Sequence, residues 1–417
     1  MAKCCLGNIV ILPILELTQK QACKIALVSQ GLHKSNAFGK DIQGAQAAIN
    51  HLSYIQIDSI SVIQRAHHHC LWSRIENYQP DFIAQLVAQK QIFEYWSHAA
   101  AYLPMQDYRF SLPKKQAIAA GERHWRDKNP IAEKRVLQRI QQEGPLRAKD
   151  FERDSTKKGS GWWDWKPDKV ALEQLFIEGE LMVVERRGFQ KVYDLTERVL
   201  PKGVDTTTPS ANEFERYLIC SYLRANGYAS TQHISYLRKG LKSHIKQTCQ
   251  EMLENAELQQ VSLGDHVYYA LPNLTDLLKQ SVNRNQVNIL SPFDNAVIQR
   301  KRLSEIFAFD YQIECYVPSA KRQYGYFSLP LLWGTEFVGR MDAKIDRKSH
   351  ILHIQNLHLE TSKVDEFIEV LQPTLKTFTE FNNGNEIKLH KLSSSHLLGL
   401  SKEAELKQQL QTLSFVN

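Results

Sequence analysis

Helical segments followed by a short β-hairpin recur along this chain, and that order restricts its fold more than any other feature. The spacing of apolar residues predicts helices over 132–142, 169–178, 213–225 and 243–255. Alternating apolar and polar residues predict paired strands at 181–185 with 191–195, and at 258–263 with 266–271. Helices followed by a two-stranded hairpin are typical of a winged helix, although generic α+β packing produces the same pattern.

The N-terminal part of the chain continues in the same style. Thr18 is a candidate N-cap for a first helix, and a second helix is predicted over 41–52. Residues 52–58 alternate like a strand. Further amphipathic helices are predicted over 62–74 and 82–93.

The pattern changes to aromatic-rich, strand-like runs in the C-terminal part. These runs span 307–316, 325–332, 337–345 and 351–359, and a helix is predicted over 363–382. We therefore expect an α+β fold, with tandem winged-helix domains followed by a C-terminal β-barrel-like domain. The predicted segments are an extension outside the fold (1–16), three winged-helix domains (17–130, 131–203 and 204–285) and the β-barrel-like domain (286–417).

Composition and charge limit the class of protein without choosing a function. The 417 residues are 43% apolar and 23% charged, which is ordinary for a soluble protein. Their net charge of +7 permits a polyanionic partner but does not demand one. The seven cysteines form no CxxC pair, which argues against a disulfide framework and a thiolate zinc site and favours the cytoplasm.

Nothing near the N-terminus is long enough to anchor the chain in a membrane. The apolar run 9–15 is much shorter than the ~20 residues that a spanning helix needs. A signal peptide is disfavoured because Lys3 is the only charge before that run and an A-x-A cleavage pattern is missing.

An amide and a carboxylate two positions apart are the first candidates for chemistry. In an extended segment Gln56 and Asp58 point to one face, while Ile55 and Ile57 point into the core. The carboxylate can activate a water and stabilise a developing positive charge, and the amide can hold that water. The alternative is local, with Asp58 capping a helix that begins near Ser61.

Basic residues and histidines supply candidates for DNA contact. Arg65 precedes His67–His69, which would point about 100° apart on a helix and so could not converge on one metal ion. That helix is expected to face DNA or simply solvent. His98, at the end of the segment EYWSH, is a candidate hydrogen-bond partner in the site or a satisfied structural residue.

A predicted hairpin with a basic tip is a further candidate. Arg186, Arg187 and Gln190 there suit a DNA groove, because arginine binds phosphates and base edges; the alternative is an exposed polar turn. Lys321 and Arg322 precede a C-terminal strand and either contact backbone phosphate or form a solvated loop.

Two further observations concern motifs. Trp162, Trp163 and Trp165 lie within four residues and are expected to pack as a small core rather than to stack on bases. No P-loop, GxGxxG, GxSxG or HExxH motif occurs in the sequence. A nucleotide hydrolase, a dinucleotide-dependent dehydrogenase and a zinc protease are therefore disfavoured.

Several segments together resemble the AlkZ/YcaQ family of winged-helix DNA glycosylases, and its YcaQ branch (AlkX-like) most closely. The resemblance runs from about Leu17 to about residue 380. Each segment alone is a weak signal, whereas the set is specific. The segments are QID (56–58), EYWSH (94–98), SGWWDWKP (160–167), ERRGFQKVYDLT (185–196), LSPFD (290–294), KRQYGYF (321–327) and VGRMD (338–342).

The resemblance implies tandem winged helices and a β-barrel in a C-shaped molecule around DNA. It implies excision of N7-alkylated purines and unhooking of interstrand crosslinks, without a metal or other cofactor. The motif Gln-Φ-Asp of the YcaQ branch, in which Φ is apolar, maps onto Gln56 and Asp58; the AlkZ branch has Gln-Φ-Gln. We expect a monofunctional, monomeric DNA glycosylase that acts on double-stranded DNA in the cytoplasm, at the nucleoid, with no membrane partner.

Two other functions fit the pattern of helices and hairpins. A winged-helix transcription regulator would bind a palindromic site as a dimer, without catalysis. A non-specific architectural protein would show neither sequence preference nor excision. Release of N7-methylguanine from a duplex would distinguish a glycosylase from both.

Overall fold

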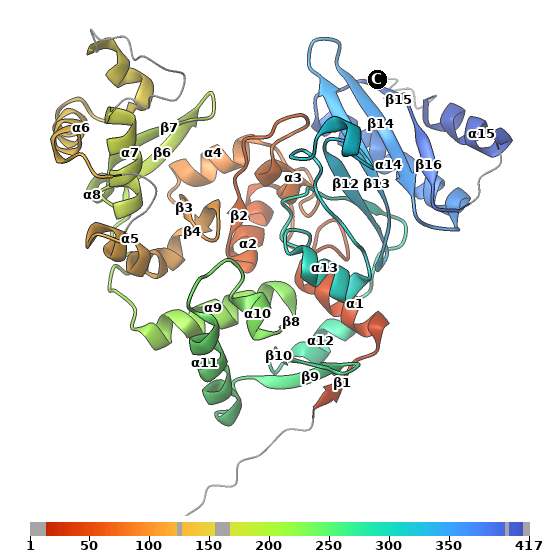
Figure 1. Ribbon diagram of the computed structural model, residues 1–417, viewed down its shortest axis with the longest axis horizontal. Coiled ribbons are helices and arrows are strands. Elements are labelled where there is room, and N and C mark those ends of the chain that lie inside the picture. Colours follow the sequence, from red (N-terminus) through yellow and green to blue (C-terminus); the bar gives the residue numbers. More distant parts are fainter. Residues whose placement is uncertain (1–13, 123–126, 155–166, 397–399, 412–417) are drawn as a thin grey trace, which may run out of the picture. The chain divides into compact units, whose positions relative to one another are not determined.

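The computed structural model describes residues 14–122, 127–154, 167–396 and 400–411 (Figure 1). The chain divides into two compact units. The first, which we call the discontinuous unit, is built from Met1–Tyr78 and Leu218–Asn417. The second, Gln79–Tyr217, lies between these segments in the sequence and is called the inserted unit. The four-domain division expected from the sequence does not coincide with these two units and stays a prediction.

The inserted unit consists of helices and two β-hairpins around one apolar core. β3 pairs antiparallel with β4, and β7 lies between β5 and β6 in a three-stranded sheet. The helices predicted over 132–142 and 169–178, and the hairpin that follows them, are confirmed. The elements are α4 (Asp81–Ala88), β3 (Ile92–Trp96), β4 (Ala100–Pro104), η1 (Met105–Ser111), α5 (Leu112–Ala119), α6 (Pro130–Glu143), β5 (Leu146–Arg147), η2 (Ala148–Asp154), α7 (Pro167–Glu178), β6 (Leu181–Arg187), β7 (Gln190–Leu195) and α8 (Thr196–Val199).

The discontinuous unit combines elements from both ends of the chain. Its N-terminal elements are β1 (Leu15–Glu16), α1 (Gln19–Ser29), α2 (Asp41–Leu52), β2 (Ile55–Gln56) and α3 (Ala66–Trp72). Its later elements are α9 (Ala211–Asn226, which begins in the inserted unit), β8 (Tyr228–Ala229), α10 (Thr231–Ile234), α11 (Lys242–Glu254), β9 (Gln259–Leu263), β10 (His266–Ala270), α12 (Leu274–Leu278), β11 (Val287–Ile289), α13 (Arg300–Phe307), η3 (Ser319–Lys321), β12 (Ser328–Trp333), β13 (Glu336–Asp346), β14 (Ile351–Leu359), α14 (Val364–Phe381), β15 (Glu386–Leu389), β16 (Leu392–Ser394) and α15 (Leu400–Gln411).

The largest sheet of the discontinuous unit has the strand order β11-β12-β13-β14-β15, and β16 also pairs with β14. α14 packs against this sheet, where its Phe367, Leu371 and Phe378 are fully buried (Figure 1). Among the described strands, β11 and β15 at the two ends of the order are not paired with each other. The sheet is therefore open, and the expected β-barrel-like closure is not observed.

A smaller sheet joins the N-terminal segment to the middle of the chain. β1 pairs in parallel with β9, so that Leu15 lies opposite Val261. The expectation that residues 1–16 form an extension outside the fold is therefore wrong for Leu15 and Glu16. Thr18 caps α1 as predicted, because its hydroxyl accepts a hydrogen bond from the Gln21 N–H and the Gln21 side chain returns one to the Thr18 backbone.

The structure corrects two predicted elements. The helix predicted over 82–93 ends at Ala88, because Lys90 adopts a positive φ of 57° and the chain then enters β3. The strand predicted over 307–316 is not formed. Its first residue ends α13, and the rest is irregular.

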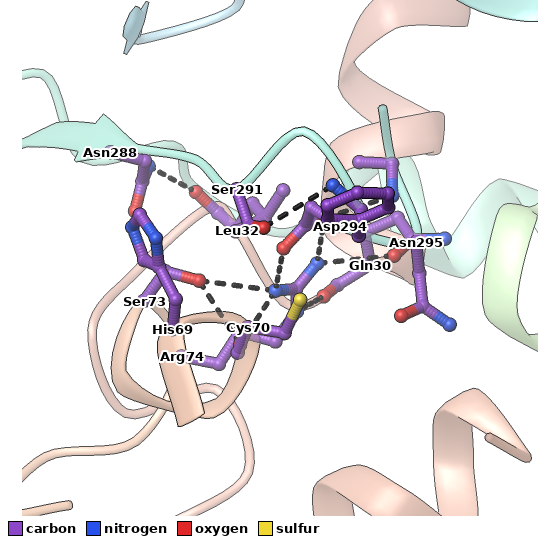
Figure 2. A network of polar contacts seen from close by, with 12 residues as sticks. Gln30, Leu32, His69, Cys70, Ser73, Arg74, Asn288, Ser291, Asp294 and Asn295 are labelled. Atoms are coloured by element: carbon purple, nitrogen blue, oxygen red, sulfur yellow. Dashed lines mark hydrogen bonds and ion pairs between the residues drawn. The ribbon is translucent and has the colours of Figure 1, made fainter. Parts of the chain in front are cut away.

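A buried ion pair between Arg74 and Asp294 joins elements of the discontinuous unit that are far apart in the sequence (Figure 2). The Arg74 guanidinium donates two hydrogen bonds to Asp294, at 2.7 and 2.8 Å, and both side chains are fully buried. Arg74 also donates to the carbonyls of Gln30 and Cys70. Burial acts to raise the pKa of Asp294, but Arg74 outweighs it and holds that pKa below its usual value. The pair therefore ties α1 and α3 to the turn after β11.

Candidate functional site

The strand β2 places Gln56 in a buried position. The Asn295 side chain donates a 3.0 Å hydrogen bond to the carbonyl of Tyr54, just before the strand. Ile55 and Ile57 are buried, as the alternation predicts, but Gln56 is also buried and only 7% exposed. Its Oε1 atom has no hydrogen-bond partner among the described residues. A buried acceptor without a partner is costly, so this oxygen is available to a water or a substrate group.

Asp58 lies just beyond β2 and is half-buried. Its Oδ1 accepts a 2.8 Å hydrogen bond from the Ile60 N–H, and within the described residues its Oδ2 has no partner in the protein. Burial raises the pKa of this carboxyl above its usual value, and the Ile60 N–H offsets the rise only in part. A carboxylate with a raised pKa is a stronger base than an ordinary aspartate.

The alternative in which Asp58 caps a helix near Ser61 is wrong. The side chain makes a local turn to Ile60, but the next helix, α3, begins only at Ala66. The N-cap of α3 is Arg65, which makes no side-chain capping bond. The sequence thus indicates correctly that the Asp58 side chain accepts a local backbone hydrogen bond, but this bond closes a turn and does not cap a helix.

The three histidines lie on a helix, as predicted, but two of them are buried rather than solvated. His67 and His69 of α3 are buried, and the His69 ring forms a 2.8 Å hydrogen bond with the carbonyl of Ile289. Burial lowers the pKa of His69 to about 4, so its ring is neutral near pH 7. Arg65 is half-buried, and its contact with DNA stays a prediction.

Lys321 and Arg322 lie in a loop, residues 314–327, that is held from within. The buried Glu314 carboxylate accepts the backbone N–H groups of Gln323, Tyr324 and Gly325 at 2.8–2.9 Å. Arg322 donates from Nε to the carbonyls of Glu314 and Val317, at 3.2 and 2.8 Å. Arg322 therefore contributes to the loop, whereas Lys321 is exposed. That either contacts phosphate stays a prediction.

This loop lies near Asp58, since Ile313 and Ile60 pack against the same apolar core. The negative charge of Asp58 contributes to raising the pKa of the Cys315 thiol and of the Tyr316 hydroxyl, in each case after the larger effect of burial. Tyr316 is 79% exposed. Tyr316 is not among the candidates predicted from the sequence. The available signal is an aromatic residue that shortly precedes Pro318, Lys321 and Arg322.

The two arginines of the basic hairpin in the inserted unit have different roles. Arg186 makes two hydrogen bonds to the buried Glu94, at 2.8 and 2.7 Å, and a third to the carbonyl of Phe189. Arg187, at the tip, is largely exposed and forms an ion pair with the neighbouring Glu185, its one such partner in the described part of the chain. Gln190 is exposed as well. Arg187 and Gln190 are thus accessible to DNA, whereas Arg186 secures the hairpin to β3.

The remaining sequence candidates are less informative. His98 lies in the turn between β3 and β4 and is half-buried. The tryptophans at 162, 163 and 165 lie outside the described residues. Within the described ranges, no group of three or more His, Cys, Asp or Glu side chains could hold a metal ion. No helix in the described part of the chain has the length and apolar character to cross a membrane.

The discontinuous unit therefore brings together a half-buried carboxylate, an unsatisfied amide oxygen nearby in sequence and an exposed aromatic loop. A carboxylate with one unpartnered oxygen can attract a cationic centre or accept a proton from water. The amide oxygen can accept a hydrogen bond from the same water. The hairpin with Arg187 is a second candidate surface, in the inserted unit.

Comparison with known proteins identifies the kind of molecule that has this arrangement. A family model described as "DNA glycosylase AlkZ-like" matches residues 49–380. The solved structure of Streptomyces sahachiroi DNA glycosylase AlkZ is similar, with a TM-score of 0.58 and 15% sequence identity. The match covers 92% of this chain and 100% of that chain. At this level of identity the structural likeness shows a shared fold.

Proposed function

Because the chain belongs to the AlkZ-like DNA glycosylase family, we propose that it excises N7-alkylated purines and unhooks interstrand crosslinks. Family membership supports DNA glycosylase action in DNA repair. The lesion, the crosslink activity and the roles of Gln56 and Asp58 are the proposal. We further propose that the enzyme acts as a monofunctional hydrolase and a monomer on DNA of the nucleoid.

The chemistry of the lesion determines what the enzyme must supply. Alkylation at N7 makes the purine cationic and therefore already a good leaving group. As the glycosidic bond breaks, positive charge develops on the sugar. A carboxylate ~4 Å away would attract that charge by about 4 kcal/mol at an effective dielectric constant of ~20. Expressed only in the transition state, this attraction would accelerate the reaction roughly a thousandfold.

The observation that carries the proposal is the electrostatic setting of Asp58. No cation is among the groups that shift its pKa, and its Oδ2 has no protein partner within the described residues. A carboxylate kept partly from water without a protein cation can complete its electrostatic environment with a cationic substrate. We assign Asp58 to stabilising the sugar cation and accepting the proton of the attacking water.

Gln56 fits the role of holding that water. Its Oε1 is buried and without a partner in the described part of the chain, so it can accept one hydrogen bond from the water. Asp58 accepts the other proton as the water attacks the sugar carbon. The products are a free purine base and an abasic site, with no covalent enzyme intermediate.

A crosslinked substrate requires a carboxylate that can be reached from the duplex, and Asp58 is only partly buried. A purine tethered to the opposite strand cannot rotate fully into a closed pocket. The loop near Asp58 carries the exposed Tyr316 and Lys321, so the described residues on this side of the carboxylate are accessible. An accessible carboxylate can reach the sugar of a nucleotide that stays close to the duplex.

A strand-cleavage assay tests the proposal. Duplexes with one N7-methylguanine, or with one N7-linked interstrand crosslink, are incubated with the enzyme, treated with alkali and resolved on a denaturing gel. We expect the wild-type enzyme to release the base. Asp58→Asn should slow excision at least ~1000-fold with little change in duplex affinity. Asp276→Asn, at an exposed aspartate, is the matched control.

Three outcomes would contradict parts of the proposal. Normal excision by Asp58→Asn would remove this residue from the mechanism. A sequence-selective footprint without base release by the wild-type enzyme would favour a transcription regulator instead. A borohydride-trapped enzyme–DNA adduct would show that the enzyme is not monofunctional.

A further inference from the structure

Tyr316 is an exposed aromatic side chain in a place where the loop around it is tightly held. It is 79% exposed. Ile313, three residues before it, packs against the same apolar core as Ile60, two residues after Asp58. Single exposed apolar residues are common on protein surfaces and usually need no explanation. Tyr316 is different, because it lies near Asp58 on a loop that is held by many hydrogen bonds.

The loop is fixed at its base by two buried carboxylates. Glu314 accepts three backbone N–H groups from Gln323 to Gly325. Asp342 of β13 accepts those of Tyr326 and Phe327, at 3.1 and 2.8 Å. Arg322 closes the loop by donating to two carbonyls near its start and by lying over the Tyr326 ring, 5.0 Å from its centroid.

Glycine at 325 allows this close packing. Its φ is +139°, and a Cβ there would lie 2.1 Å from Asp342 Oδ2. Any other residue would push the loop away from β13. Tyr316 therefore projects from a preformed support, so a ligand that binds it loses little freedom of the loop.

We propose that Tyr316 is a substrate-binding residue that stacks on the alkylated purine and favours purines that carry positive charge. This inference rests on the proposed function. A tyrosine ring offers a flat face to any base, and its negative π face attracts a cation most strongly. N7-alkylation creates such a cation, whereas undamaged purines are neutral.

The timing of charge movement separates the role of Tyr316 from that of Asp58. Positive charge resides on the base before the bond breaks and moves to the sugar as it breaks. Tyr316 therefore attracts the bound substrate more strongly than the transition state, whereas Asp58 does the reverse. Loss of Tyr316 should weaken binding of the damaged duplex with little effect on the rate at saturation.

Single-turnover kinetics with varied enzyme concentration test this division. For an N7-methylguanine duplex, we expect Tyr316→Ala to raise the half-saturating concentration about 10- to 100-fold, the range for loss of one base–aromatic stack. The saturating rate should stay within about threefold of wild type. Val267→Ala, at an exposed residue of β10, is the control and should change neither.

A graded substitution separates cation recognition from simple stacking. Phenylalanine analogues with one, two and three ring fluorines at position 316 keep the shape of the ring and weaken its attraction for cations. The half-saturating concentration should rise stepwise along this series, by roughly 2- to 10-fold in total. Affinity for the undamaged duplex should stay constant.

Three results would overturn the inference. They are an unchanged half-saturating concentration for Tyr316→Ala, a loss confined to the saturating rate, and a flat response to fluorination. The thermal unfolding temperature checks that Tyr316→Ala is folded, and Tyr316→Phe should retain most of the binding. If the wild-type enzyme does not release N7-methylguanine at all, the proposed function fails instead, which the same assay shows separately.

Discussion

Asp58 and Glu94 are acidic side chains shielded from water, one in each compact unit, and their electrostatic settings are opposite. Glu94 is buried, with the Arg186 guanidinium bound at 2.7 Å and the Lys191 ammonium 3.6 Å away. Asp58 is half-buried, and burial rather than any cation dominates its raised pKa. A carboxylate paired with a cation of the protein stabilises the fold, whereas one without such a cation can pair with a cationic substrate.

Breaking the pair at Glu94 should give the largest effect. Glu94→Gln leaves the Arg186 guanidinium largely buried without a counter-charge, so we expect the free energy of unfolding to fall by about 3–5 kcal/mol. Urea denaturation followed by circular dichroism measures it. Glu185→Gln is the matched control, because the Glu185–Arg187 pair is exposed and should contribute less than ~1 kcal/mol. Equal losses in both variants would refute the structural role of Glu94.

Lys115 extends the comparison, because it is buried and no acidic side chain of the described residues forms an ion pair with it. Its Nζ lies 3.9 Å from the centre of the Tyr108 ring, and burial lowers its pKa to about 7. From that shift, less the cation–π attraction, we expect Lys115→Met to stabilise the protein by about 2–3 kcal/mol.

The effect of Lys115 on the free energy of unfolding should depend on pH. The folded-state pKa is depressed, so the wild-type protein loses stability as the pH falls from about 10.5 to about 7. The advantage of Lys115→Met should be complete below pH 7 and should vanish above pH 10.5. Urea denaturation at pH 7 and pH 10.5 checks both limits. A constant difference across this range would show that Lys115 keeps an ordinary pKa.

The acid limb of excision should lie at a higher pH than it would for a carboxylate paired with a cation. In the proposed mechanism Asp58 must be ionised, and burial raises its pKa, so excision should decline on acidification at a pH above the usual aspartate value. Below that point the rate should fall about tenfold per pH unit, or ~1.4 kcal/mol. Single-turnover rates between pH 4 and pH 8 measure it. An acid limb at or below the ordinary pKa would mean that Asp58 is paired after all.

The smallest expected effect is at the hairpin tip. Arg187 is 59% exposed, so Arg187→Ala should weaken DNA binding without altering stability. If it contacts one phosphate, the slope of log K against log salt should decrease by about 0.9. Binding titrations at several salt concentrations test this, with Arg135→Ala, at an exposed arginine of α6, as the control. An identical slope would leave Arg187 outside the DNA interface.

Elements whose signals are local could be predicted from the sequence. The helix over 41–52 was predicted with the bounds that α2 has, and Thr18 was identified as the cap of α1. Gln56 and Asp58 were singled out because an amide and a carboxylate stand two positions apart between buried isoleucines. Family membership was also visible in the sequence, from short motifs that are specific only as a set.

What the sequence could not show depends on contacts between distant residues. The segment 307–316 was predicted to be a strand from its aromatic content. It is instead a loop, whose Glu314 binds backbone groups 9–11 residues away. The burial of His69 was not predicted for a similar reason, since its partner is Ile289, 220 residues later. No pattern in the sequence around His69 or Glu314 indicates which distant residue will be its partner.

The discontinuous construction of the unit that contains Asp58 has a consequence for synthesis in the cell. Its two parts, Met1–Tyr78 and Leu218–Asn417, are separated by the whole of Gln79–Tyr217. During translation β1 must wait for β9, and Arg74 must wait for Asp294, before either finds its partner. A truncated or still-growing polypeptide therefore carries the QID motif without the C-terminal elements that pack around it in the folded unit. The proposed catalytic site can therefore form only when synthesis of the chain is nearly complete.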